Sequence, residues 1–191
     1  MTELAPALQR WLDHLRVERR LAPRTLALYT QALARLQLAA AETGVELLQA
    51  KPHHVRGWAG QLRTRGLAPR SIAIELSAWR GLFRWWGRDG LIAANPVDGV
   101  RPPKAAKPLP KALSVDHAVA LAEHQPAGGR PALNRRDHCI VELLYGAGLR
   151  VSELVGLDLT GSASAAGWID ADEGLAHVLG KGAKRRSVPV G

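Results

Sequence analysis

The sequence lacks the features of several protein classes. It has a single cysteine, Cys139, which excludes an internal disulfide and a cysteine-based zinc site. No apolar run approaches the length of a membrane span, and the first residues do not form a basic region followed by an apolar one. We therefore expect a soluble, cytoplasmic protein with no membrane partner.

Familiar cofactor motifs are also incomplete. Gly146-Ala147-Gly148 is followed by Val151 where a dinucleotide loop needs a third glycine, and Gly180-Lys181-Gly182 has no Ser or Thr after the lysine. Two pairs of histidines have spacings that do not suit a helical metal site: His53 with His54, and His117 with His124. The sequence thus predicts no metal and no cofactor.

The positive charge is concentrated in the first part of the chain. Residues 1–112 hold 18 of the 26 basic and 8 of the 17 acidic side chains, a net charge of +10. Residues 113–191 hold 8 basic and 9 acidic side chains. A generic basic protein explains the total but not this segregation, which indicates a polyanionic partner for the first part.

The first 95 residues predict an all-α domain. Apolar residues recur at helical spacing over 3–20, 24–42, 51–65 and 69–87, with Gly44 and Gly66 ending the second and third helices. In the last helix, the apolar stripe is Ile72, Leu76, Trp79, Phe83 and Trp86. We expect these stripes to meet in one core.

Two helix starts share a motif. Leu-Ala-Pro-Arg-Thr at 21–25 recurs as Leu-Ala-Pro-Arg-Ser at 67–71. Each copy can cap its helix, or its arginine and free first-turn N–H groups can contact a phosphate. The second reading makes four residues candidate DNA contacts: Arg24, Thr25, Arg70 and Ser71.

The fourth helix carries a second stripe of Ser77, Arg80, Arg84 and Arg88. Such a row is usually a solvated face, but only one acid, Glu75, lies within this helix to neutralise it. We therefore predict that Arg80 and Arg84 contact nucleic acid and can be replaced without unfolding the domain.

Residues 96–111 predict a linker. Prolines recur there with lysines between them, a pattern that favours extended chain. The lysines either keep the linker soluble or meet DNA phosphates: Lys104, Lys107 and Lys111. We place one domain at 1–95 and a second at 112–191.

The second domain has a mixed α+β pattern. Short helices are predicted at 114–124, 134–146 and 151–157, and strand-like segments at 168–169, 175–179 and 187–190. Tyr145 lies in an apolar run and is expected in the core. The chain stops directly after a predicted strand, so we expect a domain that is truncated.

Several segments resemble tyrosine recombinases. Residues 142–159, ELLYGAGLRVSELVGLDL, resemble the family's first catalytic-arginine motif, and 178–190, VLGKGAKRRSVPV, resemble its lysine hairpin. Upstream, LAPRTLALY, SIAIELSAWRGLFRWW and ANPV resemble its N-terminal core-binding domain. The likeness is nearest to the bacterial Xer recombinases.

The resemblance implies a mechanism. A tyrosine attacks a DNA phosphate to form a 3′-phosphotyrosyl link, Arg150 stabilises charge on the phosphate oxygens, and Lys181 protonates the departing 5′ oxygen. Glu153 lies three residues after Arg150 and could orient it. Without the family match, a structural salt bridge between Arg150 and Glu153, and a solvated turn lysine, would be the preferred readings. Lys184, Arg185 and Arg186 follow the hairpin lysine, so Lys184 and Arg185 are further candidate DNA contacts.

The family's later motifs, a His-x-x-Arg, a further His or Trp and the nucleophilic tyrosine, have no place in the second domain. We therefore expect a four-helix core-binding domain, half of a clamp around DNA, followed by the incomplete start of a mixed α+β catalytic domain with a small antiparallel sheet. The expected function is site-specific recombination, with chromosome dimer resolution as the biological role.

The expected partners are double-stranded DNA and a paired recombinase subunit in a homo- or hetero-tetramer. The chain alone is expected to bind DNA without recombining it. The alternatives are a phage or transposon integrase and a truncated, non-catalytic DNA-binding protein.

Overall fold

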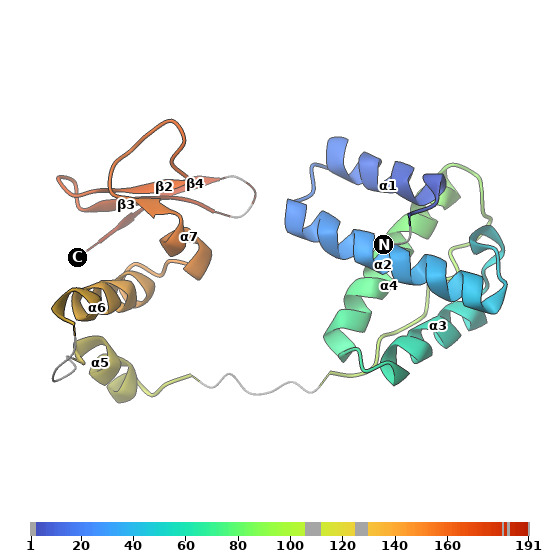
Figure 1. Cartoon of the computed structure of the whole chain (residues 1–191), viewed down its shortest axis with the longest axis horizontal. Coiled ribbons are helices and arrows are strands. Elements are labelled where there is room, and N and C mark those ends of the chain that lie inside the picture. Colours follow the sequence, from blue (N-terminus) through green and yellow to red (C-terminus); the bar gives the residue numbers. More distant parts are fainter. Residues whose placement is uncertain (1–2, 106–111, 125–129, 181, 183, 191) are drawn as a thin grey trace. The chain divides into compact units, whose positions relative to one another are not determined.

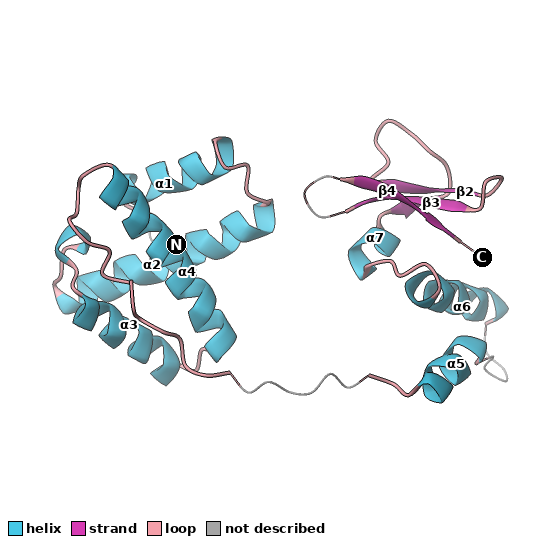
Figure 2. Ribbon diagram, turned by 180° about the vertical axis from the view of Figure 1, so that it is seen from behind, coloured by secondary structure: helices cyan, strands magenta, loops and turns pink. Residues whose placement is uncertain are grey.

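The chain forms two compact units, Met1–Pro108 and Leu109–Gly191. The computed structural model describes residues 3–105, 112–124, 130–180, 182 and 184–190 (Figure 1). The first unit is helical, and all described strands lie in the second (Figure 2). No helix among the described residues is both long and apolar enough to cross a membrane.

Unit 1 contains the four expected helices. Their ends differ by at most three residues from the ranges that the apolar spacing predicts, and a 3-10 turn, Leu47–Gln49, precedes the third. Each helix begins with a proline, whose fixed φ suits a first turn and whose missing N–H is not needed there. The helices are α1 (Pro6–Val17), α2 (Pro23–Thr43), α3 (Pro52–Thr64) and α4 (Pro69–Arg88).

The α4 helix is the centre of the unit 1 core. Its whole predicted apolar stripe is buried, and it packs against α1, α2 and α3. The Trp79 indole Nε1 donates a hydrogen bond of 2.9 Å to the Ala32 carbonyl of α2. Buried Glu75 pairs with Arg35 of α2, and burial raises the pKa of the Glu75 carboxyl despite that arginine.

The packing of unit 1 continues past residue 95, where we expected a linker to begin. Val97 and Val100 are buried in the same core as the four helices. The Asn95 side chain donates to the Arg80 carbonyl at 3.1 Å and accepts from the Val97 N–H at 3.0 Å. The two buried valines and the Asn95 amide hold this segment against unit 1. The part of the expected linker up to Val100 therefore packs on the helical core.

Unit 2 combines three helices with a four-stranded sheet. The helices are α5 (Val115–Glu123), α6 (Pro131–Tyr145) and α7 (Val151–Val155). Ser114 caps α5 by accepting a hydrogen bond from the His117 N–H at 3.3 Å. The strands are β1 (Leu157–Asp158), β2 (Gly167–Asp170), β3 (Leu175–Leu179) and β4 (Arg185–Pro189), in that order across the sheet.

The sheet contains the expected antiparallel strands and, in addition, one short parallel strand. Strands β2, β3 and β4 are antiparallel neighbours, whereas β1 pairs with β2 in parallel. The parallel pair has only two residues on β1, Leu157 and Asp158, and the sequence predicted Leu157 as the end of a helix. A strand of two residues is too short to show an alternation of apolar and polar residues. It forms only by pairing with β2, which follows it after a loop.

The two faces of the sheet differ in chemistry. Cross-strand pairs share a face, and one face carries Ala176 opposite Val188 and Val178 opposite Arg186. Ala176 and Val178 are buried. The other face carries Trp168, His177 and Ser187, with the Trp168 and His177 rings stacked at 4.6 Å.

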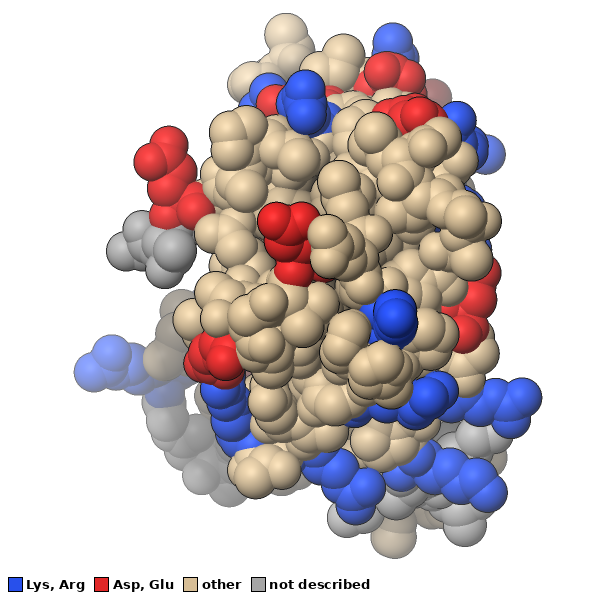
Figure 3. Space-filling view, turned by 90° about the vertical axis from the view of Figure 1, so that its right-hand side faces the viewer, with Lys and Arg blue, Asp and Glu red and all other residues tan. Residues whose placement is uncertain are grey.

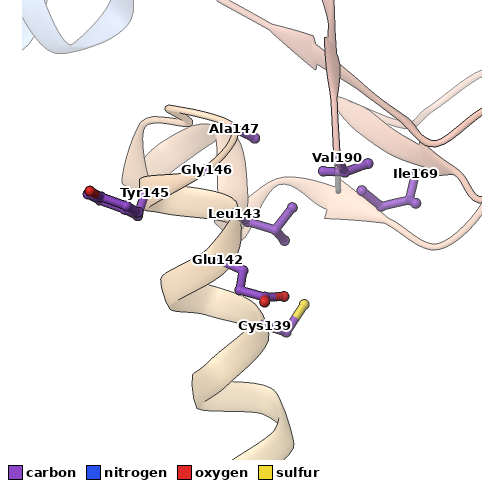
Figure 4. Close-up of a pocket in the computed structure, with 8 residues that line it drawn as sticks. All are labelled: Cys139, Glu142, Leu143, Tyr145, Gly146, Ala147, Ile169 and Val190. Atoms are coloured by element: carbon purple, nitrogen blue, oxygen red, sulfur yellow. The ribbon is translucent and has the colours of Figure 1, made fainter. Parts of the chain in front are cut away.

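The described residues of unit 2 bury little apolar surface. None of the described residues of α6 is buried. An apolar hollow of about 430 Å³ lies between α6 and the sheet, with Leu143, Ile169 and Val190 among its lining residues. Tyr145, predicted in the core, is 60% exposed and points away from Ile169 and Val190 (Figure 4). The apolar run around it is helical, and position 145 lies on the outward side.

Candidate functional site

A polar hollow of about 530 Å³ lies on unit 1 between α1, the start of α2 and α4. Ser77 and Tyr29 line it, with the tyrosine hydroxyl 3.4 Å from the serine oxygen. No acidic side chain is among the described lining residues. Guanidinium groups give the hollow a positive potential that suits phosphate. The four arginines that line it are Arg19, Arg80, Arg84 and Arg88.

Arg80 and Arg84 differ within this hollow. Arg84 is exposed, as predicted. Arg80 is half-buried, and its guanidinium donates to the Val100 carbonyl at 3.0 Å and the Val97 carbonyl at 3.4 Å. Arg80 therefore helps to hold the 95–100 segment, so its replacement is expected to reduce stability, while the prediction that the domain stays folded remains a prediction.

The repeated Pro-Arg-hydroxyl motif does not cap its helices through side chains. The N-cap residues of α2 and α4 are Ala22 and Ala68, and neither makes a side-chain cap hydrogen bond. Arg24 and Arg70 are exposed, Thr25 is half-buried and Ser71 is exposed. None of the four lines the polar hollow; Ser71 lines a separate, smaller one. The structure does not bring them together with Arg84.

The surface charge of unit 1 is uneven. On the face shown in Figure 3, Lys and Arg side chains toward the lower end have few acidic neighbours, whereas those at the upper end lie among Asp and Glu side chains. A protein with dispersed charge would show no such difference. The uneven distribution agrees with the net charge of the sequence and suits a polyanion that contacts one side of the unit.

Arg150 lies at the start of α7 in unit 2, as its motif predicted. Gly148 has a φ of 61°, a left-handed conformation that lets the chain turn sharply after α6. Leu149 is buried and anchors the turn, and Arg150 is the N-cap residue of α7. The turn presents the Arg150 side chain, which is 63% exposed, on a fixed backbone.

Buried Glu153 holds this turn. Its carboxylate accepts from the Arg150 backbone N–H and from Arg150 Nη1, both at 2.8 Å. It also accepts two hydrogen bonds from Arg186 of β4. The Arg186 hydrogen bonds and the Arg150 N–H lower the pKa of Glu153 to about 2. Because this value lies below the ordinary 4.5, the pairing stabilises unit 2 above pH 4.5, and that contribution is lost as the pH falls toward 2.

The other candidate residues of unit 2 and the linker have varied surroundings. Lys181, Lys107 and Lys111 lie outside the described residues. Lys104 and Lys184 are exposed. The Arg185 guanidinium lies 5.2 Å from the centre of the Trp168 ring and donates to the Ala165 carbonyl at 3.4 Å. Arg185 is thus on the exposed face of the sheet, opposite to Arg186.

One group of potential metal ligands escaped the sequence analysis. Ligand atoms of Asp170, Glu173 and His177 lie within 4.8 Å of one another at the β2–β3 turn. The Asp170 carboxylate accepts the N–H groups of Asp172 and Glu173, which is the role of an aspartate that closes a turn. These hydrogen bonds and the solvent exposure explain the group without a metal.

Neither tyrosine has the surroundings of an activated nucleophile. The Tyr29 ring stacks on Trp11 at 5.8 Å, and the described hydrogen-bond partner of its hydroxyl is Ser77 rather than a basic residue of the same hollow. Exposed Tyr145 has no basic residue among its described neighbours in the apolar hollow. The spacing His-x-x-Arg does occur, at His53 and Arg56, but on α3 of unit 1 and before Arg150.

Comparisons with known proteins point to one family. The family described as "Phage integrase, N-terminal SAM-like domain" matches residues 8–90. "Tyrosine recombinase XerC" of Ralstonia pickettii is 50% identical over 97% of this chain and 58% of its own length. The protein of the same name from Salmonella typhi is 41% identical over 100% of this chain and 61% of its own length. The chain thus spans about three fifths of the curated relatives that it matches.

Solved structures share the fold. A lambda integrase dimer bound to a COC′ core site has a TM-score of 0.62 at 16% identity, over 96% of this chain and 60% of that chain. The Tn1549 transposon integrase in complex with transposon right end DNA has a TM-score of 0.60 at 16% identity, over 97% of this chain and 61% of that chain. At such identities the likeness concerns the fold alone.

Proposed function

We propose that the chain is the N-terminal part of a tyrosine recombinase, the family that it matches, and that it forms the DNA-binding and phosphate-activating part of this site-specific enzyme. The whole enzyme cuts and rejoins DNA strands through a 3′-phosphotyrosyl intermediate. Its nucleophilic tyrosine comes from the part of the relatives that this chain does not span. The observation that carries the proposal is Arg150, presented on the α7 turn by a buried carboxylate within the matching motif.

The proposed chemistry of Arg150 follows from its charge and geometry. A guanidinium is permanently charged and planar, and it offers paired N–H groups to two non-bridging phosphate oxygens. Charge on these oxygens increases in the transition state, so a preorganised donor lowers the barrier. Only one Arg150 side-chain hydrogen bond within the described residues is recorded, to Glu153, and the group remains exposed to a substrate. Lys181 is proposed to protonate the departing 5′ oxygen.

The proposed partners are double-stranded DNA and a paired recombinase subunit, in a tetramer on DNA. The lambda integrase structure is a dimer on its core site, which supports pairing in this fold. We propose chromosome dimer resolution in the cytoplasm as the biological role, because relatives with up to 50% identity carry the name XerC. No cofactor takes part in the proposed chemistry, since the covalent link stores the energy needed for rejoining.

A hybrid enzyme tests the proposed activity. In this hybrid recombinase, the chain is continued by the part of the Ralstonia pickettii relative that lies beyond the match. We expect it to form a 3′-phosphotyrosyl adduct on the target DNA of that relative. A hybrid recombinase that is folded and binds this DNA, yet forms no adduct, would contradict the proposed function.

DNA binding by the chain is expected to depend on salt and on Arg84. Each phosphate contact releases counterions, so the logarithm of the binding constant falls linearly with the logarithm of salt concentration. Arg84→Ala should weaken binding at every sequence and reduce that slope by about 1. Fluorescence anisotropy of a labelled duplex, followed from low to moderate salt, measures both.

Two variants serve as controls for this measurement. Arg65→Ala removes the same charge from a residue that pairs with Glu42 at 2.7 Å, outside the hollow, and should leave the slope unchanged. Arg80→Ala should lower the melting temperature of unit 1, because it removes the guanidinium donor of the Val100 carbonyl and one of the two donors of the Val97 carbonyl, which also accepts from the Val100 N–H at 3.1 Å. A binding constant that does not change with salt concentration would contradict an interface with DNA phosphates.

The chain alone is expected to form no covalent adduct with a suicide DNA substrate. The described hydrogen-bond partner of the Tyr29 hydroxyl is Ser77, and Tyr145 has no basic residue among its described neighbours in the apolar hollow. Denaturing gel electrophoresis, followed by peptide mapping, would detect an adduct. A product at Tyr145 would assign the nucleophile to this exposed residue and favour a complete enzyme, whereas DNA binding without an adduct agrees with a fragment or a non-catalytic DNA-binding protein.

A further inference from the structure

One carboxylate in unit 2 is shared by two arginines that lie far apart in the sequence. Glu153 Oε1 accepts from Arg150 Nη1 at 2.8 Å and from Arg186 Nη1 at 2.6 Å. Glu153 Oε2 accepts from the Arg150 backbone N–H at 2.8 Å and from Arg186 Nη2 at 3.0 Å. All of these bonds are charge-assisted, and the buried carboxylate has both of its oxygens occupied.

The two arginines use Glu153 differently. Arg186 makes the two parallel hydrogen bonds of a fork on a carboxylate, which is the strongest geometry for this pair. Arg150 makes a single side-chain bond to it. The exposed fractions agree, since the side chain of Arg186 is 38% exposed and that of Arg150 is 63% exposed.

The sheet directs Arg186 toward this carboxylate. Arg186 pairs with buried Val178 across β3 and β4, on the face of the sheet that also carries Ala176. Gly180 closes the hairpin by donating its N–H to the Lys184 carbonyl at 2.8 Å. A side chain at Gly180 would begin 3.2 Å from Arg186 Nη1, so the absence of one leaves room for the guanidinium.

We propose that Arg186 is a positioning residue for Arg150, acting by occupying and neutralising Glu153 so that the Arg150 guanidinium remains available to the DNA phosphate. This inference rests on the proposed function of Arg150. Arg150, Arg186 and Glu153 together carry a net charge of +1. Without Arg186 the net charge is zero, and Glu153 can take the fork position on Arg150 itself. The positive charge of Arg150 would then be neutralised by the Glu153 carboxylate and would no longer stabilise the transition state.

Single-turnover cleavage by the hybrid recombinase tests this role. We expect Arg186→Ala to slow cleavage by about ten- to a hundredfold, because a misplaced catalytic group loses that much rate, while the dissociation constant for DNA changes little. Adding Glu153→Gln to Arg186→Ala should recover part of the lost rate, since the group that captures Arg150 no longer carries a charge. Arg186→Lys should retain an intermediate rate, because it keeps the charge without the fork.

The matched control is Arg136→Ala, which removes an exposed arginine of unit 2 from a pair with Asp137 and should not change the rate. A merely structural role would make the double variant slower than Arg186→Ala, not faster. A direct role on phosphate would give equal losses in both variants. Either result overturns the proposal, as does an unchanged rate in Arg186→Ala.

A second readout uses the chain itself and does not need activity. The carboxyl ¹³C signal of Glu153, titrated with acid, should show a higher pKa in Arg186→Ala than the value of about 2 that the two arginines hold in the unmodified chain. An unmoved pKa contradicts the shared carboxylate. If the unmodified hybrid recombinase binds DNA but does not cleave, the proposed function fails, and this titration still decides whether Arg186 controls the charge of Glu153.

Discussion

Replacing Arg150 by alanine in the hybrid recombinase is expected to slow DNA cleavage by at least about a hundred- to a thousandfold, the loss typical of removing one donor to a transition-state oxyanion. DNA affinity should change little, because the phosphate contacts of unit 1 remain. The expected rate effect follows from the proposed role of Arg150, which is exposed at the start of α7 and would contact the phosphate as its charge increases. Single-turnover cleavage and binding, measured on the same duplex, separate the two effects.

Lys181 provides the comparison for Arg150. A substrate with a 5′-bridging sulfur needs no proton at its leaving atom, so it should restore the rate of Lys181→Ala and leave Arg150→Ala impaired. Rescue of both variants to the same degree, or of neither, would show that the division of roles between oxyanion donor and general acid is wrong. Lys184, exposed on the same hairpin, would then be the next general-acid candidate.

Replacing Trp79 by alanine is expected to cost unit 1 about 3–5 kcal/mol in its free energy of unfolding. The side chain is fully buried, and its indole donates to the Ala32 carbonyl at 2.9 Å. The substitution leaves a cavity between α2 and α4 and removes the second hydrogen bond of the Ala32 carbonyl, which keeps its helical donor within α2. Urea unfolding, followed through amide signals of the α2 and α4 residues, measures the loss.

Two substitutions separate the causes of this loss. Trp79→Phe keeps much of the ring and removes the hydrogen bond to a carbonyl that keeps its helical donor, so the lost bond should cost roughly 0.5–1.5 kcal/mol. Trp85→Ala removes a half-buried indole of the same helix, stacked on His14 at 6.0 Å, and should cost less than Trp79→Ala. If Trp79→Phe proves as costly as Trp79→Ala, the hydrogen bond rather than the packing dominates.

The sequence predicts what depends on neighbours along the chain. Helical spacing of apolar residues and first-turn prolines place all four helices of unit 1, and the motif places Arg150 at the start of α7. These features are local, because the spacing of apolar residues that marks a helix or a strand can be read within that segment alone. The family resemblance adds the order of the two domains, which periodicity alone does not provide.

The features that the sequence missed depend on distant partners. Arg80 lies on a polar stripe, but its partners are carbonyls at 97 and 100, which return to α4 only in the fold. The parallel strand β1 was likewise missed because it depends on pairing with β2. Arg186 left a usable signal, because alternation along β4 separates it from Arg185 and places it with Val188. The basic residues at 184–186 therefore include side chains on both faces of the sheet, a difference that the amino-acid composition does not show.

The position of Val100 in the core has a consequence during protein synthesis. Every buried residue of the unit 1 core lies between Leu8 and Val100, so its described core needs nothing from the second half of the chain. Bacterial ribosomes add about 5–20 residues per second, and residues 101–191 therefore take roughly 5–18 seconds to make. During that interval the emerging chain already contains all of this core. Unit 1 can thus fold while unit 2 is still being translated, and misfolding of unit 2 need not disturb the core of unit 1.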